Sequence, residues 1–203
     1  MHLRAPAILL ASRPHGETAV VARMLTGEFG VVAGYVAGGR GRQLRPVVIP
    51  GNRVELQLSA RSDSQLPFAK LELLESRGPW LGEPLAAAAI AWACALSATA
   101  LPERQPYPSI YQALGGLLDA ICHAPSARGW AGALVGYETL LLRELGYGAN
   151  GPWGNRPLGD LVDIIAAMDK LAGPLDEYLL ADRRGDVMAA RARLRELLGR
   201  MVG

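Results

Sequence analysis

The chain has few of the residues that bind metals or perform covalent chemistry. Its 203 residues include two cysteines and three histidines. Cys94 and Cys122 fall inside helical apolar patterns, away from a second ligand at metal-binding spacing, so we expect them to be small buried side chains. No metal site and no cofactor are predicted, and this use of cysteine fits a reducing cytoplasm.

Catalytic motifs are also missing. The three histidines lie near the ends of different predicted elements, without a neighbouring carboxylate. Ser12 and Ser97 lack the sequence context of a nucleophilic serine, and the glycines of residues 38–41 are not followed by the Lys-Ser or Lys-Thr of a nucleotide-binding P-loop. We therefore expect a protein that is not an enzyme.

Long apolar runs are scarce. The one uncharged stretch, Pro84–Leu101, is rich in alanine, which predicts a buried core helix and not a membrane span. The first residues, Met1–Arg4, lack the charged and apolar pattern of a secretory signal. These features predict a cytoplasmic protein without membrane contact.

The positive charges that are present belong almost entirely to arginine. Only Lys70 and Lys170 are lysines among the 21 basic residues. Basic residues outnumber acidic ones before about Gly82 and not after it, so the net charge of +2 conceals a basic first part. Half of all residues are apolar, which is enough to build a sizeable core.

The first 80 residues have the pattern of five short strands. The clearest is Arg53–Ser59, in which apolar and polar residues strictly alternate. In the fifth run, Ala69, Leu71 and Leu73 alternate with Lys70 and Glu72, which predicts a fifth strand. Five short strands suit a small closed barrel, because closure removes exposed sheet edges. The predicted strands cover residues 7–13, 18–25, 29–37, 53–59 and 69–73.

From Glu83 onward the apolar spacing becomes helical. Pro84 is placed as a first-turn proline, and Gly146 is placed as the stop of the third helix. Pro174 is predicted to start a short fifth helix before a final one. The predicted fold class is therefore α+β, with a barrel domain at residues 1–80 followed by an all-α helical domain at residues 83–203.

A Gly-rich basic loop, Gly38–Pro46, lies between the third and fourth predicted strands. Its glycines allow a close backbone approach, and Arg40, Arg42 and Arg45 carry planar, permanently charged donor groups that suit phosphate oxygens. The loop therefore suits a mobile phosphate-binding finger, and Arg53 on the polar face of the next strand adds a fourth cation that would neutralise phosphates without reading sequence. The alternative is a solvated hairpin tip whose charges only maintain solubility.

Aromatic residues are sparse in the same part of the chain. Tyr35 is its only tyrosine before Gly82, and Phe29 and Phe68 are its only phenylalanines. A platform for base stacking would be thin, so contacts to backbone phosphates are expected to dominate.

One charged residue lies at an apolar position of the third predicted helix. Glu138 falls at helical spacing from Leu134, Leu141 and Leu145, so its carboxylate is expected in or beside a core. A buried charge is costly unless it is paired. We predict a structural role, in which Glu138 accepts backbone N–H or arginine hydrogen bonds and joins two helices.

Three segments in the same order resemble the RecO family of bacterial recombination and DNA-repair proteins. Arg13–Thr18 matches the family's Arg-Pro-x-x-Glu-Thr, and Leu25–Gly30 matches its Leu-Thr-x-x-x-Gly. The basic loop then leads to a proline, as in the family. Tyr137–Tyr147 resembles the family's Phe-Glu…Leu-Leu…Leu-Gly-Tyr.

The resemblance implies an oligonucleotide-binding (OB) type barrel followed by a helical domain. RecO proteins bind single- and double-stranded DNA and anneal complementary strands. With RecR they help to load the RecA recombinase onto DNA coated by single-stranded DNA-binding protein (SSB), and they are not enzymes. The resemblance therefore implies a nucleoid-associated protein of the cytoplasm with DNA, RecR and SSB as partners, and RecA as an indirect one. The acidic, apolar-ended SSB tail would need nearby cations, for which Arg128 and Arg143 are the candidates.

The chain departs from the family pattern in several places. Many relatives carry a four-cysteine zinc module after the Leu-Gly-Tyr, but Ala149–Asn155 contains no cysteine. Gly38 stands where a lysine often precedes the glycine of the loop, and the later part is shortened. A different class of function also fits the residues: a protein-interaction adaptor in which the helices bind a partner and the barrel is only a scaffold.

Overall fold

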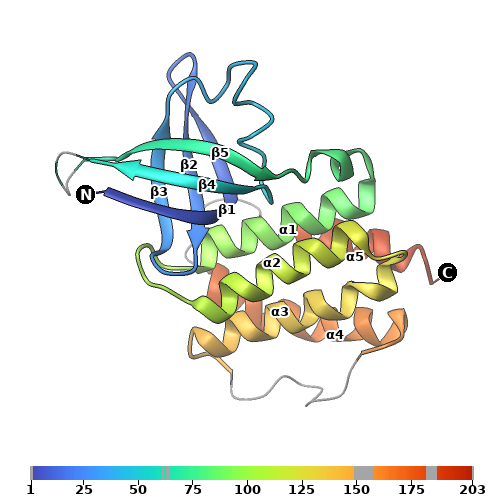
Figure 1. Cartoon of the computed structure of the whole chain (residues 1–203). Coiled ribbons are helices and arrows are strands. Elements are labelled where there is room, and N and C mark those ends of the chain that lie inside the picture. Colours follow the sequence, from blue (N-terminus) through green and yellow to red (C-terminus); the bar gives the residue numbers. More distant parts are fainter. Residues whose placement is uncertain (1, 61, 63–64, 149–157, 182–186, 203) are drawn as a thin grey trace. The chain divides into compact units, whose positions relative to one another are not determined.

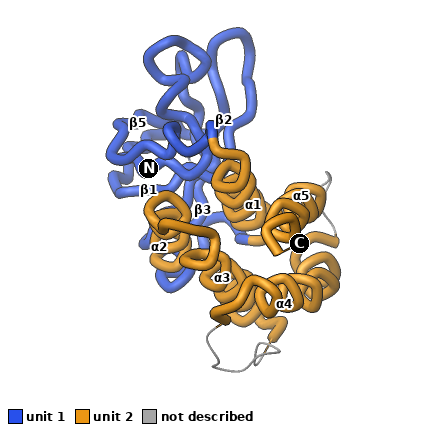
Figure 2. The backbone as a smooth tube through the Cα atoms, turned by 90° about the vertical axis from the view of Figure 1, so that its right-hand side faces the viewer, with its two compact units in different colours: residues 1–82, 101–111 blue, residues 83–100, 112–203 orange. Residues whose placement is uncertain are grey.

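The computed structural model describes residues 2–60, 62, 65–148, 158–181 and 187–202. The chain forms two compact units, residues 1–82 with 101–111, and residues 83–100 with 112–203 (Figure 2). After the first helix the chain therefore returns to the first unit before it completes the second.

The first unit is a closed five-stranded barrel (Figure 1). Strand β1 pairs antiparallel with β2 and β4, while β2 pairs with β3 and β4 pairs with β5 in the same way. The ring closes where β3 meets β5 in parallel, at Tyr35 and Phe68. This order is that of the OB fold, and the predicted α+β class is confirmed. The strands are β1 (His2–His15), β2 (Ala19–Thr26), β3 (Gly30–Val36), β4 (Arg53–Ser59) and β5 (Phe68–Glu75).

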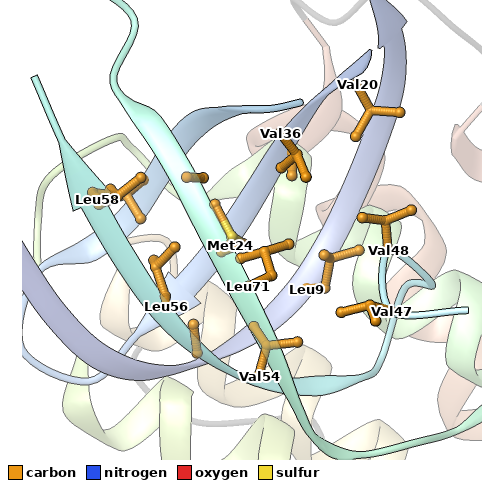
Figure 3. Close-up of a cluster of buried hydrophobic side chains, with 14 residues drawn as sticks. Leu9, Val20, Met24, Val36, Val47, Val48, Val54, Leu56, Leu58 and Leu71 are labelled. Atoms are coloured by element: carbon orange, nitrogen blue, oxygen red, sulfur yellow. The ribbon is translucent and has the colours of Figure 1, made fainter. Parts of the chain in front are cut away.

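The barrel core follows from the alternation in β4. Val54, Leu56 and Leu58 are buried, as predicted, and they pack with Leu9 and Met24 from the neighbouring strands (Figure 3). Burial of these apolar side chains is the main favourable contribution to the barrel's stability. The outward residues of the same strands remain available for other contacts.

Strand β5 differs from its prediction at one end. Its first two inner residues are buried, but Leu73 is 38% exposed. The pairing explains this, because Val54 pairs with Leu73 while the preceding Arg53 pairs with Glu75. Leu74 is thus an extra residue in a β-bulge, which breaks the alternation. The predicted fifth strand is present, and its alternation ends at Leu73.

The segment at residues 101–111 completes the first unit along β3. Val31 and Glu103 form an isolated parallel bridge. Gly30 adopts a φ of +66°, and a Cβ atom there would lie 2.1 Å from the carbonyl oxygen of Gln105. Only glycine allows this approach of the two backbones. The sequence pattern contains no signal for this contact.

The second unit contains the helices. Helix α1 is a core helix, as predicted, and completely buries Trp92, Ala93 and Leu96. Gly146 follows α3 with a φ of +90°, which is the expected helix stop. No helix of the described ranges is long and apolar enough to cross a membrane. The helices are α1 (Pro84–Ala100), α2 (Pro108–His123, its first turn in the first unit), α3 (Ala131–Glu144), α4 (Leu161–Pro174) and α5 (Val187–Gly199).

Pro174 does not open a separate helix. It lies inside α4, and the chain continues in helical conformation into a π-helical segment, Leu175–Leu180. Proline has no N–H to donate to the preceding turn, and the wider hydrogen-bond spacing of a π-helix accommodates such a gap. Pro174 therefore alters the helical geometry without ending the helical path.

Candidate nucleic-acid interface

The loop between β3 and β4 is folded and not open. Gly38 has a φ of +66° and accepts a hydrogen bond from the backbone N–H of Gly41 at 2.8 Å. The N–H of Arg45 donates to the carbonyl of Gly41 at 2.9 Å. These turns use the glycines for backbone geometry and keep the intervening side chains on the outside.

The end of the loop is fixed to the barrel. Val47 and Val48 are each 8% exposed and belong to the barrel core. The buried Asn52 amide donates to the carbonyls of Pro46 at 2.9 Å and Val47 at 3.0 Å, and its oxygen accepts from the N–H of Arg77 at 2.7 Å. The sequence predicts a mobile loop, and these contacts attach its end, Pro46–Val48, to the barrel. A fixed loop presents its charges at lower entropic cost on binding.

Three of the predicted arginines lie together. Arg40, Arg42 and Arg45 line one hollow of about 600 Å³, with Pro46 and Ile49. All three arginines are exposed. The side chains of Arg42 and Arg45 make no hydrogen bond or ion pair with any residue that the structure describes. Their donor groups are therefore available to an anionic ligand.

Arg40 also connects the loop to the β1–β2 turn. Its Nη1 donates to the carbonyls of Gly16 at 3.4 Å and Glu17 at 3.1 Å, and its backbone N–H donates to Thr18 at 2.9 Å. These bonds orient the guanidinium and leave its other nitrogens toward solvent. Arg40 is thus both a positioning residue for the loop and part of the hollow.

Arg53 is not part of this arrangement. It lies at the start of β4, its side chain is 41% exposed, and its Nη1 is 3.7 Å from a carboxylate oxygen of Glu75. It does not line the hollow. The structure therefore brings three of the four predicted DNA-binding arginines together and separates the fourth.

A row of aromatic side chains crosses the outside of the barrel, which the sequence did not reveal. His15, Tyr35 and Phe68 lie on three different strands. The ring centroids of His15 and Tyr35 are 5.6 Å apart, and those of Tyr35 and Phe68 are 5.1 Å apart, both edge to face. The strand register creates this aromatic row, so no local sequence signal could have found it.

A second hollow adjoins one end of the aromatic row. Its volume is about 910 Å³, and Phe68 forms part of its wall. Lys70 of β5 supplies a cation to the wall, and His2 of β1 also lines it. Arg4 also lines it and is already paired with Glu55 at 2.6 Å. The remaining lining residues are Leu3, Ala37, Gln43, Leu44, Gln57, Leu58, Ser59, Ala69 and Leu71.

The two partner-binding candidates lie in the second unit. Arg128 is exposed in a short 3₁₀ turn, Ala127–Gly129. Arg143 lies in α3, is 59% exposed, and has Nη2 3.4 Å from a carboxylate oxygen of Glu144. Neither lines one of the two hollows. Both are open to solvent, so a partner can reach them.

Glu138 is completely buried in the second unit. Its carboxylate accepts from the indole N–H of Trp92 at 2.8 Å and from Nε and Nη2 of Arg191, both at 2.8 Å. Arg191 also donates to the carbonyl of Met168 at 2.8 Å. Burial raises the pKa of the neighbouring Tyr137 hydroxyl, which is hydrogen-bonded to Ser97. Glu138 thus joins α1, α3 and α5 through a paired charge.

The site chemistry is that of ion binding. Arginine remains protonated at all physiological pH values, so the arginines of the hollow act as fixed charges and not as acids or bases. Within the described part of the chain, no group of three or more His, Cys, Asp or Glu side chains is placed to hold a metal. The cysteine-free segment Ala149–Asn155 lies outside the described residues.

Comparison with known proteins identifies two family models on this chain. Residues 1–77 match the model described as Recombination protein O N terminal, and residues 81–151 match Recombination protein O C terminal. The matched regions cover the barrel and the first three helices.

Curated relatives named DNA repair protein RecO agree with this match. The chain is 45% identical to the protein of Rhodospirillum centenum over 143 residues, 70% of this chain and 56% of the relative. For Rhodospirillum rubrum the identity is 42% over 144 residues, covering 70% and 57%. For Phenylobacterium zucineum it is 38% over 149 residues, covering 73% and 60%. The chain thus spans less than two thirds of the length of these curated relatives.

Proposed function

Because the chain belongs to the RecO family of DNA repair proteins, we propose that it is a DNA-binding recombination mediator whose barrel grips backbone phosphates. The observation that carries this proposal is the hollow lined by Arg40, Arg42 and Arg45. Two of these arginines have free donor groups within the described residues. Phosphate oxygens are the ligand that best matches three planar cations on a fixed loop.

The proposed mechanism uses charge and alignment without covalent chemistry. Each arginine that neutralises a phosphate releases condensed counterions, which favours binding to any sequence. Contacts to phosphate fix the position of a strand but do not read its bases. A strand held in this way keeps its bases available for pairing, so the protein can anneal complementary strands. Binding of single- and double-stranded DNA follows from the same contacts.

The helical unit supplies the proposed protein contacts. By family membership we propose RecR and the SSB tail as partners, and RecA as an indirect one. The SSB tail is acidic, so it needs exposed cations, and Arg128 and Arg143 are both exposed. If they bind the tail, Arg143→Glu will weaken the binding of an SSB-tail peptide and leave the affinity for DNA unchanged. Loss of DNA affinity with unchanged peptide binding would reverse the assignment of the two units.

The deciding experiment is the salt dependence of DNA binding. Affinity for a single-stranded oligonucleotide is measured between about 50 and 200 mM salt for the wild type and for Arg40→Ala/Arg42→Ala/Arg45→Ala. We expect affinity to fall steeply with salt in the wild type, and the logarithmic slope to be smaller by about 2 in the triple variant, at about 0.7 per contact. An unchanged slope in the triple variant would refute the loop as the main DNA contact.

Two single variants complete this experiment. Arg143→Ala removes an exposed arginine of the helical unit and should leave the slope unchanged. Arg53→Ala measures whether the fourth predicted arginine contributes to DNA binding, although it lies outside the hollow. A protein-interaction adaptor with a scaffold barrel would bind no DNA, or would bind it with the same slope in all four proteins.

A further inference from the structure

The aromatic row carries a second inference about the same barrel. Phe68 is one of two phenylalanines in the chain. Its side chain is large and apolar, yet the residue is 59% exposed. It packs edge to face on Tyr35, which packs edge to face on His15. Aromatic contacts connect the rings within the row, and more than half of the surface of Phe68 remains accessible. Exposed apolar side chains that form a contiguous patch, unlike single scattered ones, mark interaction or ligand-binding sites.

The sheet register extends this row toward β2 and β1. Tyr35 pairs with Phe68 on β5 and with Val21 on β2, and Val21 pairs with Arg13 on β1. The outward side chains of four strands therefore follow one another across the barrel. Arg13 is exposed, and its side chain makes no hydrogen bond or ion pair with the residues that the structure describes. A free cation thus lies in line with the aromatic rings.

The basic loop meets the row at both ends. At one end, Arg40 donates to the carbonyls of Gly16 and Glu17, which directly follow His15. At the other end, Gln43 of the loop lines the same hollow as Phe68. The phosphate-binding loop and the aromatic row are therefore parts of one continuous surface of the barrel.

We propose that unpaired nucleobases stack on the row His15–Tyr35–Phe68 while the adjacent arginines hold the backbone of the same strand. This inference rests on the proposed function and adds a preference for single strands. Only the few bases over the row are engaged, so the bases of the rest of the strand stay available for pairing. Charge supports nucleic acid over an apolar peptide as the occupant, because cations flank the rings. In a duplex the bases stack on each other, so only an unpaired strand offers its base faces.

The test separates bases from phosphates. The full chain is titrated with oligodeoxythymidine and with an oligonucleotide of the same length whose sugars carry no bases. We expect the base-bearing strand to bind about ten-fold more tightly. Phe68→Ala should remove this preference and leave binding of the abasic strand and its salt slope unchanged. Phe68→Leu keeps apolar volume without a flat ring and should give the same result, which covers the possibility that the alanine variant does not fold.

Phe29→Ala is the matched control. Phe29 is the other phenylalanine of the barrel, is 37% exposed, and lies in the β2–β3 turn outside the row. It should retain the full preference for bases. Equal affinity of the wild type for both strands would overturn the stacking proposal while leaving phosphate binding intact. Failure to bind either strand would instead refute the proposed function. Tight binding of an apolar peptide at Phe68 would mean that the row binds a peptide and not nucleobases.

Discussion

Arginine is used in opposite ways in the loop of the barrel and in the core of the helical unit. Arg191 is 3% exposed and donates to Glu138 and to the carbonyl of Met168, with the Trp92 ring centre 5.8 Å from its guanidinium carbon. Arg42 and Arg45 are exposed and have no partner among the described residues. The same type of side chain thus serves the fold at Arg191 and is free at Arg42 and Arg45.

The difference follows from the cost of removing charge from water. A guanidinium can be buried only if an opposite charge and further acceptors replace its hydration. Arg191 meets this condition, so its charge is neutralised inside the protein. A cation that the fold neither pairs nor buries keeps its attraction for external anions. In a chain this rich in arginine, the number of arginines therefore does not identify the anion-binding ones. Whether each guanidinium is paired within the fold does.

The largest expected effect comes from breaking the buried pair. Glu138→Ala leaves Arg191 buried without its counter-charge, so we expect the free energy of unfolding to fall by roughly 3–5 kcal/mol. Denaturant unfolding followed by tryptophan fluorescence measures this loss, because Trp92 donates to the same carboxylate. Glu196→Ala on the same unit is the control, since Glu196 pairs with Arg200 and both are exposed. A loss no larger than in this control would mean that the pair does not support the fold.

A double variant sharpens this result. Replacing both partners, as in Glu138→Leu/Arg191→Met, removes the buried charges together. We expect it to be more stable than Glu138→Ala, because no uncompensated charge remains. If the double variant is the less stable of the two, the hydrogen bonds to Trp92 and Met168 matter more than charge compensation.

An intermediate effect is expected from an exposed pair, Asp169 and Arg195. Arg195 donates to both carboxylate oxygens, at 2.9 and 2.7 Å, and these bonds lower the pKa of Asp169 below its ordinary value of 3.8. The stabilisation is therefore fully present above that pH and is lost as pH falls through the lower folded-state pKa. Asp169→Asn should cost about 0.2–1 kcal/mol at neutral pH, since the pair is solvent-exposed.

The pH dependence identifies this contribution. Unfolding of the wild type and Asp169→Asn should converge in strong acid, where Asp169 is protonated in both states. Asp176→Asn, at an exposed position of the following π-helical segment, is the control and should show no such convergence. A constant difference between wild type and Asp169→Asn at all pH values would contradict a role for the charge.

The smallest effect on stability is expected at the loop. Arg42→Ala/Arg45→Ala removes two exposed side chains without partners in the described structure, so the free energy of unfolding should change by less than about 0.5 kcal/mol. The same variant should lose DNA affinity at low salt. Denaturant unfolding and oligonucleotide titration on one preparation test both statements. Marked destabilisation would show that these arginines serve the fold after all.

Local patterns in the sequence predicted most of the architecture. The alternation of Arg53–Ser59 defined β4. Helical spacing predicted six helices, of which five match α1 to α5 to within a few residues, while the prediction of a separate helix from Pro174 was wrong. Features that depend on pairing between distant segments were missed. The bulge at Leu74 and the return of residues 101–111 to the barrel leave no periodic signal.

The candidate site divides along the same line. Arg40, Arg42 and Arg45 were predictable as a group because they are neighbours in one loop. The position of Arg53 relative to that loop depends on strand pairing, which the sequence pattern does not show. The apolar spacing around Glu138 predicted its burial, but its partner Arg191 lies 53 positions away. The aromatic row likewise exists only through strand pairing. Whether these residues bind DNA remains a prediction.

The return of residues 101–111 to the barrel has a consequence for synthesis and dissection of the protein. A chain cut after residue 82 would contain all five strands but would lack the backbone that approaches Gly30. On the ribosome, the barrel cannot reach its final form until α1 and the following segment have emerged. The two units are therefore interleaved along the chain, and neither can be separated from the other by a single cut.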